Sequence, residues 1–318
     1  MEFRVLSKIS VLVMLLLAAV SCSKPVKVAI PGYEEKVVIE GLIETDGFPL
    51  VLISKNKNVY APVSQAEILG SYLSGATVWV SDGTTTIQLT EICTDNLPAG
   101  MDTTVANFLG IPLEVLNQTT ICAYVGLDPN FKGEVGKTYT LKVDFEGKTY
   151  QAASKILDPI PLLSSYWKEE TDLPDYGFSH HFLQDPPQKN NAYLFEVKRL
   201  NVDSTGQPKD KRYYKTFTPY IDDEFFNGKT FEFFYENPMS YDEEIPDAYK
   251  GYYKRGDTLE IKFSNYEYNV FRFLYAISLQ KMSGGSPFTL PTNAVGNIPG
   301  ALGAWIAFSP TYSTLVCQ

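Results

Sequence analysis

Residues 139–152 read YTLKVDFEGKTYQA, with a Glu-Gly pair at positions 146 and 147 between two alternating stretches. In residues 139–143 and again in residues 149–152, apolar or β-branched side chains alternate with polar ones, which is the period of a half-buried β-strand. Glycine tolerates the positive φ that a tight hairpin turn requires. The stretch therefore predicts a β-hairpin that turns at Glu146 and Gly147.

The same pattern occurs earlier in the chain. Four further alternating segments lie at residues 36–41, 50–54, 76–80 and 85–89. Asp46-Gly47 and Asp82-Gly83 supply turns between them. Six short strands separated by turn residues are typical of a β-sandwich, so we expect residues 35–157 to form an immunoglobulin-like β-sandwich domain.

The second half of the chain begins at a break in the pattern. Asp158-Pro-Ile-Pro161 cannot continue a strand ladder, because Pro lacks an N–H and restricts its neighbour. The predicted boundary therefore falls between residues 157 and 158, and residues 158–318 form a second β-rich domain. Its expected strands cover residues 192–197, 211–215, 229–234, 258–263 and 302–308.

This second domain also carries one helix signal. Ser264 with Glu267 three positions later has the spacing of a capping box, and apolar residues follow at helical spacing until Gly284-Gly285. These residues predict a helix over about residues 265–282. The expected fold class is mainly β: an immunoglobulin-like sandwich followed by a β-rich domain with one helix.

The N-terminal residues have the three zones of a secretory signal peptide. Arg4 and Lys8 precede an apolar run over residues 9–20, and small residues then lead to Cys22. The run is too short to span about 30 Å of hydrocarbon at about 1.5 Å per residue. Residues 1–21 are therefore the expected signal peptide.

Cys22 ends the stretch LAAVSC, residues 17–22, which resembles the lipobox of bacterial lipoproteins. In such proteins the cysteine is acylated and becomes the new N-terminus; the alternative is an ordinary signal peptide that a cysteine happens to follow. We expect lipidation of Cys22 and a tether over residues 22–34. Because Ser23 rather than Asp follows the cysteine, the expected address is the outer membrane, reached through the acyl chains. The choice between its periplasmic face and the cell surface stays open, with the surface favoured.

The composition excludes several classes of protein. The 318 residues include 27 basic and 37 acidic ones, a net charge of −10 that argues against a nucleic-acid partner. Aromatic residues make up 14%, which is too many for a disordered chain, and 4 Cys are too few for a disulfide scaffold.

The remaining cysteines and the two histidines give no catalytic or metal motif. Cys93 and Cys122 lie at the ends of an expected loop and are the favoured disulfide pair, which leaves Cys317 as a buried or free thiol. His180 and His181 are adjacent, so in an extended chain they point to opposite faces and cannot both bind one metal. We expect them in a surface loop, and we expect no cofactor.

Acidic residues cluster at positions 222–224 and 242–244. We interpret both clusters as solvated, turn-rich surface. Two alternatives stay open: a calcium site built from these oxygens, and a hydrolase that uses two carboxylates on either side of a scissile bond.

Aromatic residues in loops favour contact with a ligand or partner. Tyr241, Tyr249, Tyr252 and Tyr253 lie among Pro and Gly residues, where large amphipathic rings commonly mark a binding surface. A sugar face, a peptide or a partner subunit would each suit them. Separately, Thr103 and Ser204 each follow an Asp in tripeptides that resemble O-glycosylation acceptors of Bacteroidota.

Several fragments taken in order suggest a family. They are Cys22, YEEKVVIEG at 33–41, ATV at 76–78, GKTYTL at 136–141, PIP at 159–161, DEFFNGK at 223–229, GSPF at 285–288 and GNI at 296–298. Together they resemble the Bacteroidota lipoprotein family known as domain of unknown function 4249, over nearly all of the mature chain. The resemblance implies an outer-membrane lipoprotein encoded beside TonB-dependent transporters, and it carries no catalytic residues.

The expected function is therefore that of a non-enzymatic accessory or ligand-binding component of a TonB-dependent nutrient uptake system. A transporter, and a glycan or peptide ligand, are the expected partners. A surface hydrolase and an adhesin or assembly component are the alternatives. An adhesin or assembly component would present a flat hydrophobic patch rather than a cleft.

Overall fold

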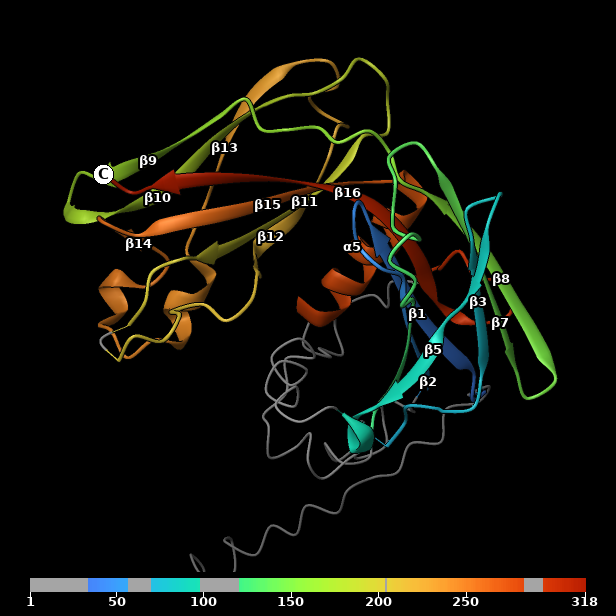
Figure 1. Cartoon of the computed structure of the whole chain (residues 1–318). Coiled ribbons are helices and arrows are strands. Elements are labelled where there is room, and N and C mark those ends of the chain that lie inside the picture. Colours follow the sequence, from blue (N-terminus) through green and yellow to red (C-terminus); the bar gives the residue numbers. More distant parts are fainter. Residues whose placement is uncertain (1–33, 57–69, 98–119, 204, 283–293) are drawn as a thin grey trace, which may run out of the picture. The chain divides into compact units, whose positions relative to one another are not determined.

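The computed structural model describes residues 34–56, 70–97, 120–203, 205–282 and 294–318 (Figure 1). The described residues confirm a mainly β fold with several sheets. The largest sheet has eight strands in the order β12 (Tyr214–Asp222), β11 (Ala192–Arg199), β15 (Thr258–Tyr266), β16 (Leu302–Val316), β1 (Val37–Glu44), β2 (Leu50–Lys55), β6 (Cys122–Val125) and β5 (Thr90–Cys93).

A four-stranded sheet packs against one end of the large sheet and forms what we call the first sandwich. Its strands are, in order, β4 (Thr86–Gln88), β3 (Thr77–Ser81), β7 (Thr138–Phe145) and β8 (Lys148–Lys155). Alternate residues of β7, including Leu141 and Val143, meet Ile39 of β1 and Trp305 of β16 in one buried cluster. The Trp305 indole N–H also donates to the Tyr139 carbonyl oxygen at 2.8 Å, which ties the two sheets together.

The hairpin turns of the first sandwich follow the sequence prediction. β7 and β8 pair in register up to Phe145 and Lys148, and the turn residues Glu146 and Gly147 have φ of 48° and 75°. Residues 82–85, with Gly83 at a φ of 89°, form a longer turn that joins β3 to β4. The sandwich packing fits the expected architecture of this half of the chain.

A second four-stranded sheet covers the other end of the large sheet and forms the second sandwich. Its strands are β9 (Ser164–Glu170), β10 (Leu173–Gln184), β13 (Thr230–Tyr235) and the short β14 (Tyr253–Lys254). Phe195 of β11 and Phe263 of β15 meet Tyr235 and Tyr253 in its core. Several segments differ from prediction. The strand expected over 211–215 is β12, which begins at Tyr214 and continues to Asp222, and β9 and β10, like β5 and β6 in the first half, lie where no strand was expected.

The long strand β16 belongs to both sandwiches (Figure 1, red). It pairs in parallel with β1 through residues 302–308 and antiparallel with β15 through residues 308–316. Trp305 lies in the core of the first sandwich and Leu315 in that of the second. The large sheet thus contains strands from both sides of the boundary that was expected between residues 157 and 158.

The opposite face of the large sheet carries the one α-helix among the described residues. Helix α5 spans Tyr268–Met282, and its Val270 and Phe271 pack on Leu194 and Phe308. The predicted capping box is wrong, because β15 continues to Tyr266 and takes Ser264 into the strand. The Glu267 carboxylate instead accepts hydrogen bonds from the Ser154 hydroxyl and the Lys155 N–H of β8.

Candidate functional site

The outer face of the second four-stranded sheet is covered with aromatic side chains. Along β10, Gly177, Ser179, His181 and Leu183 are buried, so the alternate residues face outward. These outward side chains, with their neighbours from β9, β13 and the segment before β14, form what we call the aromatic surface: Tyr166, Tyr176, Phe178, His180, Phe182, Phe234, Tyr249 and Tyr252.

Contacts between the rings hold this surface together. His180 stacks on Tyr166 at 4.9 Å on one side and on Phe234 at 5.4 Å on the other, because these residues are directly opposite one another in β9, β10 and β13. Phe178 contacts Tyr252 at 4.8 Å, which extends the row of rings toward β14. Because each ring is packed against another, few rotamers need to be frozen when a partner binds.

One carboxylate lies among these rings. Glu232 accepts a hydrogen bond from the Tyr166 hydroxyl at 2.5 Å and contacts His180 Nδ1 at 2.9 Å. The Tyr166 hydrogen bond, followed by the His180 contact, lowers the pKa of Glu232. The carboxylate is thus satisfied by its neighbours, and the centre of the aromatic surface carries little unpaired polarity.

The surface remains open to solvent. Phe234 is 57% exposed and Tyr166 is 39% exposed. Exposed Lys168 and Lys254 lie at its rim, opposite Phe178 and Tyr176. An exposed aromatic patch with a charged rim is the usual composition of a protein-binding surface.

The four tyrosines expected to make contacts have different environments. Tyr249 and Tyr252 belong to the aromatic surface, and Tyr241, on the short helix η2 (Pro238–Asp242), is 59% exposed. Tyr249 comes from η3 (Asp247–Tyr249). Tyr253 is fully buried, and its hydroxyl donates to the Glu236 carbonyl oxygen at 3.0 Å. Tyr253 is therefore a core residue and not a contact residue, because β14 turns it toward the second sandwich.

The histidines lie in strand β10 and not in a surface loop, so that expectation was wrong. They do point to opposite faces, as their adjacency required. His181 is fully buried between the hydroxyl groups of Ser165 and Ser179, at 2.8 and 3.0 Å. Burial lowers the pKa of His181 to about 3, so its ring stays neutral over the physiological range.

The acidic clusters are only partly solvated. Asp223 is buried and accepts hydrogen bonds from the backbone N–H groups of Asn190 and Asn191. Glu243 forms an ion pair with buried Arg199 at 2.6 Å. Both carboxylates therefore hold the chain together locally.

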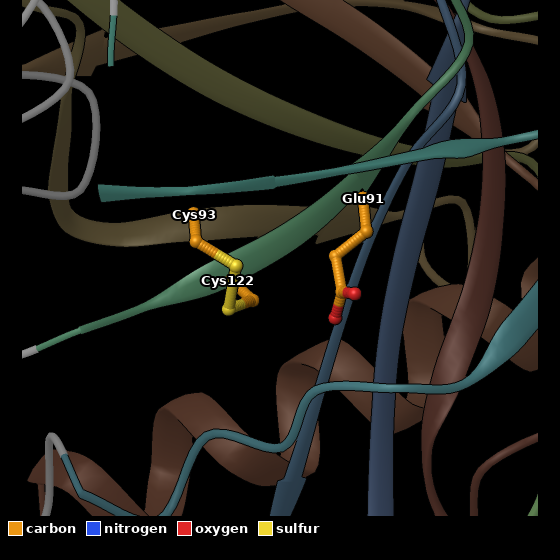
Figure 2. A group of neighbouring side chains, drawn as sticks. All are labelled: Glu91, Cys93 and Cys122. Carbon is orange, nitrogen blue, oxygen red and sulfur yellow. A yellow bond between two sulfur atoms is a disulfide. The ribbon is translucent and has the colours of Figure 1, made fainter. Parts of the chain in front are cut away.

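Cys93 and Cys122 form the disulfide favoured by the sequence, between directly opposite residues of β5 and β6. Figure 2 shows the pair with Glu91 beside it. The three side chains have the proximity of a metal site, but the disulfide leaves no thiolate to coordinate an ion. The Glu91 carboxylate instead accepts hydrogen bonds from the Tyr124 hydroxyl at 2.8 Å and the Gly75 N–H at 2.9 Å. Cys317 is a buried free thiol.

Some predicted sites lie outside the described residues. These are the lipidation site Cys22 and the two glycosylation candidates Thr103 and Ser204. Within the described ranges, no helix has the length and apolar character needed to cross a bilayer.

A comparison with protein families matches residues 23–313 to the family described as Domain of unknown function (DUF4249). The chain belongs to the DUF4249 family. No curated protein matches it. The match extends over both sandwiches, so the aromatic surface lies inside the part of the chain that DUF4249 covers.

Proposed function

We propose that this protein is a non-enzymatic outer-membrane lipoprotein that docks on a TonB-dependent transporter through the aromatic surface and assists nutrient uptake. The observation that carries the proposal is the row of mutually packed rings on β9, β10 and β13, in which Tyr166 and Phe234 are exposed and the others are partly buried. Large exposed apolar patches are uncommon on soluble monomers and mark interaction sites.

The composition of the surface favours a protein partner. Tyr and Phe are enriched in the centres of protein interfaces, whereas charges belong to the rim, as Lys168 and Lys254 do here. The rings are also preordered by their own contacts, which lowers the entropic cost of docking. The choice of a transporter as that partner rests on the lipobox and on the resemblance to lipoproteins encoded beside such transporters.

A pull-down from native outer membranes in mild detergent tests this proposal. The full-length chain is expected to recover a TonB-dependent transporter, and the double variant Phe178→Ser/Phe234→Ser should lose most of it because the centre of the surface is removed. Phe217→Ser is the matched control, since Phe217 of β12 is 70% exposed but lies outside the aromatic surface. Recovery of the wild-type protein alone, or equal recovery with the double variant, would contradict the proposal.

The anchor is tested separately. Cys22→Ala should abolish incorporation of labelled fatty acid and move the protein from the membrane fraction to the soluble fraction. Unchanged labelling would show that acylation occurs elsewhere. Protease accessibility on intact cells then distinguishes the cell surface, which we favour, from the periplasmic face.

A further inference from the structure

The outer face of the four-stranded sheet in the first sandwich contains a polar hollow around one tryptophan. Trp79 of β3 is partly exposed and lies directly opposite Gln88 of β4 and Lys142 of β7, and Lys142 in turn lies opposite Gln151 of β8. The hollow has a volume of about 330 Å³, and we call it the Trp79 hollow. It is lined by Trp79, Ser81, Thr86, Thr140, Lys142 and Gln151.

The lining combines one aromatic ring with groups that can donate and accept hydrogen bonds. Thr140 contributes a hydroxyl and Gln151 an amide, and among the described residues neither side chain hydrogen-bonds to another. Hydroxyls and amides can each both donate and accept. They can therefore bind sugar hydroxyl groups in either orientation.

The Trp79 indole can bind the C–H groups of a sugar, as the hydroxyl and amide groups bind its hydroxyls. The face of an aromatic ring carries negative charge density, which attracts the weakly positive C–H groups on the face of a pyranose. The Lys142 ammonium lies over this ring, 4.6 Å from its centre, as the same electrostatics predicts, so a pyranose that stacks on Trp79 must displace the Lys142 side chain toward Asp144. A pyranose presents both C–H groups and hydroxyls, and the lining of the hollow can bind both.

The charge balance favours a neutral ligand. Lys142 Nζ lies 3.0 Å from the Asp144 carboxylate, which also accepts a hydrogen bond from the Thr149 hydroxyl at 2.6 Å. The cation of the hollow is thus matched by an anion fixed beside it. An acidic sugar would gain little from Lys142 and would be repelled by Asp144.

We propose that the Trp79 hollow binds a ring of a neutral saccharide. This site is separate from the aromatic surface, and the proposal does not depend on transporter docking. The protein would then carry two contact surfaces on its two small sheets, one for a sugar and one for a protein.

Intrinsic fluorescence gives a direct measurement. The chain has three tryptophans, and Trp305 and Trp167 are buried, so Trp79 is the one that a ligand can reach. The full-length chain in detergent is titrated with maltohexaose, xylohexaose, mannohexaose and hexagalacturonate. At least one neutral hexaose should shift the Trp emission, and calorimetry should give the same dissociation constant.

Variants locate the site. Trp79→Ala should weaken binding at least about tenfold, and Thr140→Val about fivefold, because a ring contact and a hydrogen bond are lost respectively. Thr138→Val is the matched control: it makes the same change on the outer face of β7 at a position that does not line the hollow, so it should bind as the wild type does. Phe178→Ser/Phe234→Ser should also retain saccharide binding, which separates this proposal from transporter docking.

Three results would overturn the proposal. They are the absence of binding by every neutral hexaose at millimolar concentration, full retention of binding by folded Trp79→Ala, and tighter binding of hexagalacturonate than of the neutral sugars. If Trp79→Ala does not fold, the comparison of Thr140→Val with Thr138→Val decides the outcome.

Discussion

The first and second sandwiches have the same layering, and both bury apolar residues, but the outer faces of their small sheets differ in polarity. In the first, the four-stranded sheet buries apolar residues such as Leu141 and Val143 and exposes hydroxyls, amides and one tryptophan. In the second, the corresponding sheet buries Leu183 and Tyr235 together with His181 and Ser179, and its outer face carries a row of partly exposed aromatic rings. The comparison shows that an apolar inner face leaves the polarity of the outer face free, so that face can be polar in one sheet and aromatic in the other.

The interiors differ as well. Of the buried polar side chains in the described residues, Ser154 alone belongs to the first half of the chain, and the others lie between residues 179 and 309. The second sandwich therefore adds internal ion pairs and hydrogen bonds to its apolar core, whereas the first adds a disulfide.

The largest expected effect removes the buried charge of the second sandwich. Arg199 is 3% exposed, and its guanidinium contacts Asp210 at 2.7 Å and Glu243 at 2.6 Å. Arg199→Met leaves Asp210 buried without its partner, so the free energy of unfolding should fall by about 3 to 5 kcal/mol in urea titrations.

The control for that measurement is Arg255→Met. Arg255 also contacts two carboxylates, those of Asp175 and Glu169, but its side chain is 43% exposed. Solvent screens such pairs, so the loss should be about 1 kcal/mol or less. Equal losses in the two variants would show that burial of the ion pair does not distinguish the sandwiches.

The disulfide is the corresponding test in the first sandwich. Replacing Cys93 and Cys122 by Ser frees a loop with a sequence separation of 29, which should cost about 3 to 4 kcal/mol in the chain-entropy model. Reduction of the wild type should reproduce this loss, whereas Cys317→Ala should leave the response to reduction intact. A double variant as stable as the wild type would contradict a stabilising role for the bridge.

The acid sensitivity of the second sandwich should reside in His181. Because burial lowers its folded-state pKa to about 3, the unfolded chain binds a proton near pH 6.5 that the folded chain does not. The free energy of unfolding should therefore fall as the pH drops below about 6.5, by about 2 kcal/mol at pH 5. His181→Asn should remove this slope, and His180→Gln, on the outer face of the same strand, should keep it.

The smallest effect concerns a turn of the first sandwich. The backbone N–H groups of Thr85 and Thr84 lower the pKa of Asp82 to about 2, with a further contribution from Lys137 at 3.0 Å. Stability from this group is present above about pH 4 and is lost as the pH falls toward 2. Asp82→Asn should cost about 1 kcal/mol at pH 7. Glu134→Gln removes the other carboxylate that pairs with Lys137, and it should lower the free energy of unfolding by less. If Glu134→Gln costs more than Asp82→Asn, the ion pairs of Lys137, and not the backbone hydrogen bonds of Asp82, stabilise the turn.

Much of the first sandwich was predictable from sequence because its signals are local. The Asp-Gly and Glu-Gly turns lie between strands that pair with their sequence neighbours, and their inward residues are apolar. The strand order of the large sheet was not predictable, because β16 pairs with β1 across most of the chain. No short sequence window carries that information.

Tyr249 and Tyr252 were predicted as contact residues, but the strand residues of the aromatic surface were not, for a physical reason. In residues 176–183 the inward positions are Gly, Ser, His and Leu, while rings occupy the outward ones, which is the reverse of the usual amphipathic strand. Ring and non-ring residues do alternate along this sequence. A prediction that places the apolar residues inside, however, assigns the rings to the core and the wrong face to the solvent. Tyr252 and Tyr253 have different environments because neighbouring residues at a strand point to opposite faces. The start of β14 places Tyr253 inward, and the residue types alone do not show this.

The position of β16 also bears on how the protein is delivered. Every strand that β16 pairs with precedes it in the chain, and both cores need its side chains. A polypeptide that is exported unfolded cannot complete the core of either sandwich until residues 302–316 have left the translocation channel. Such long-range closure is slow, so under the proposed export the nascent chain would stay competent for translocation and complete both halves only after release.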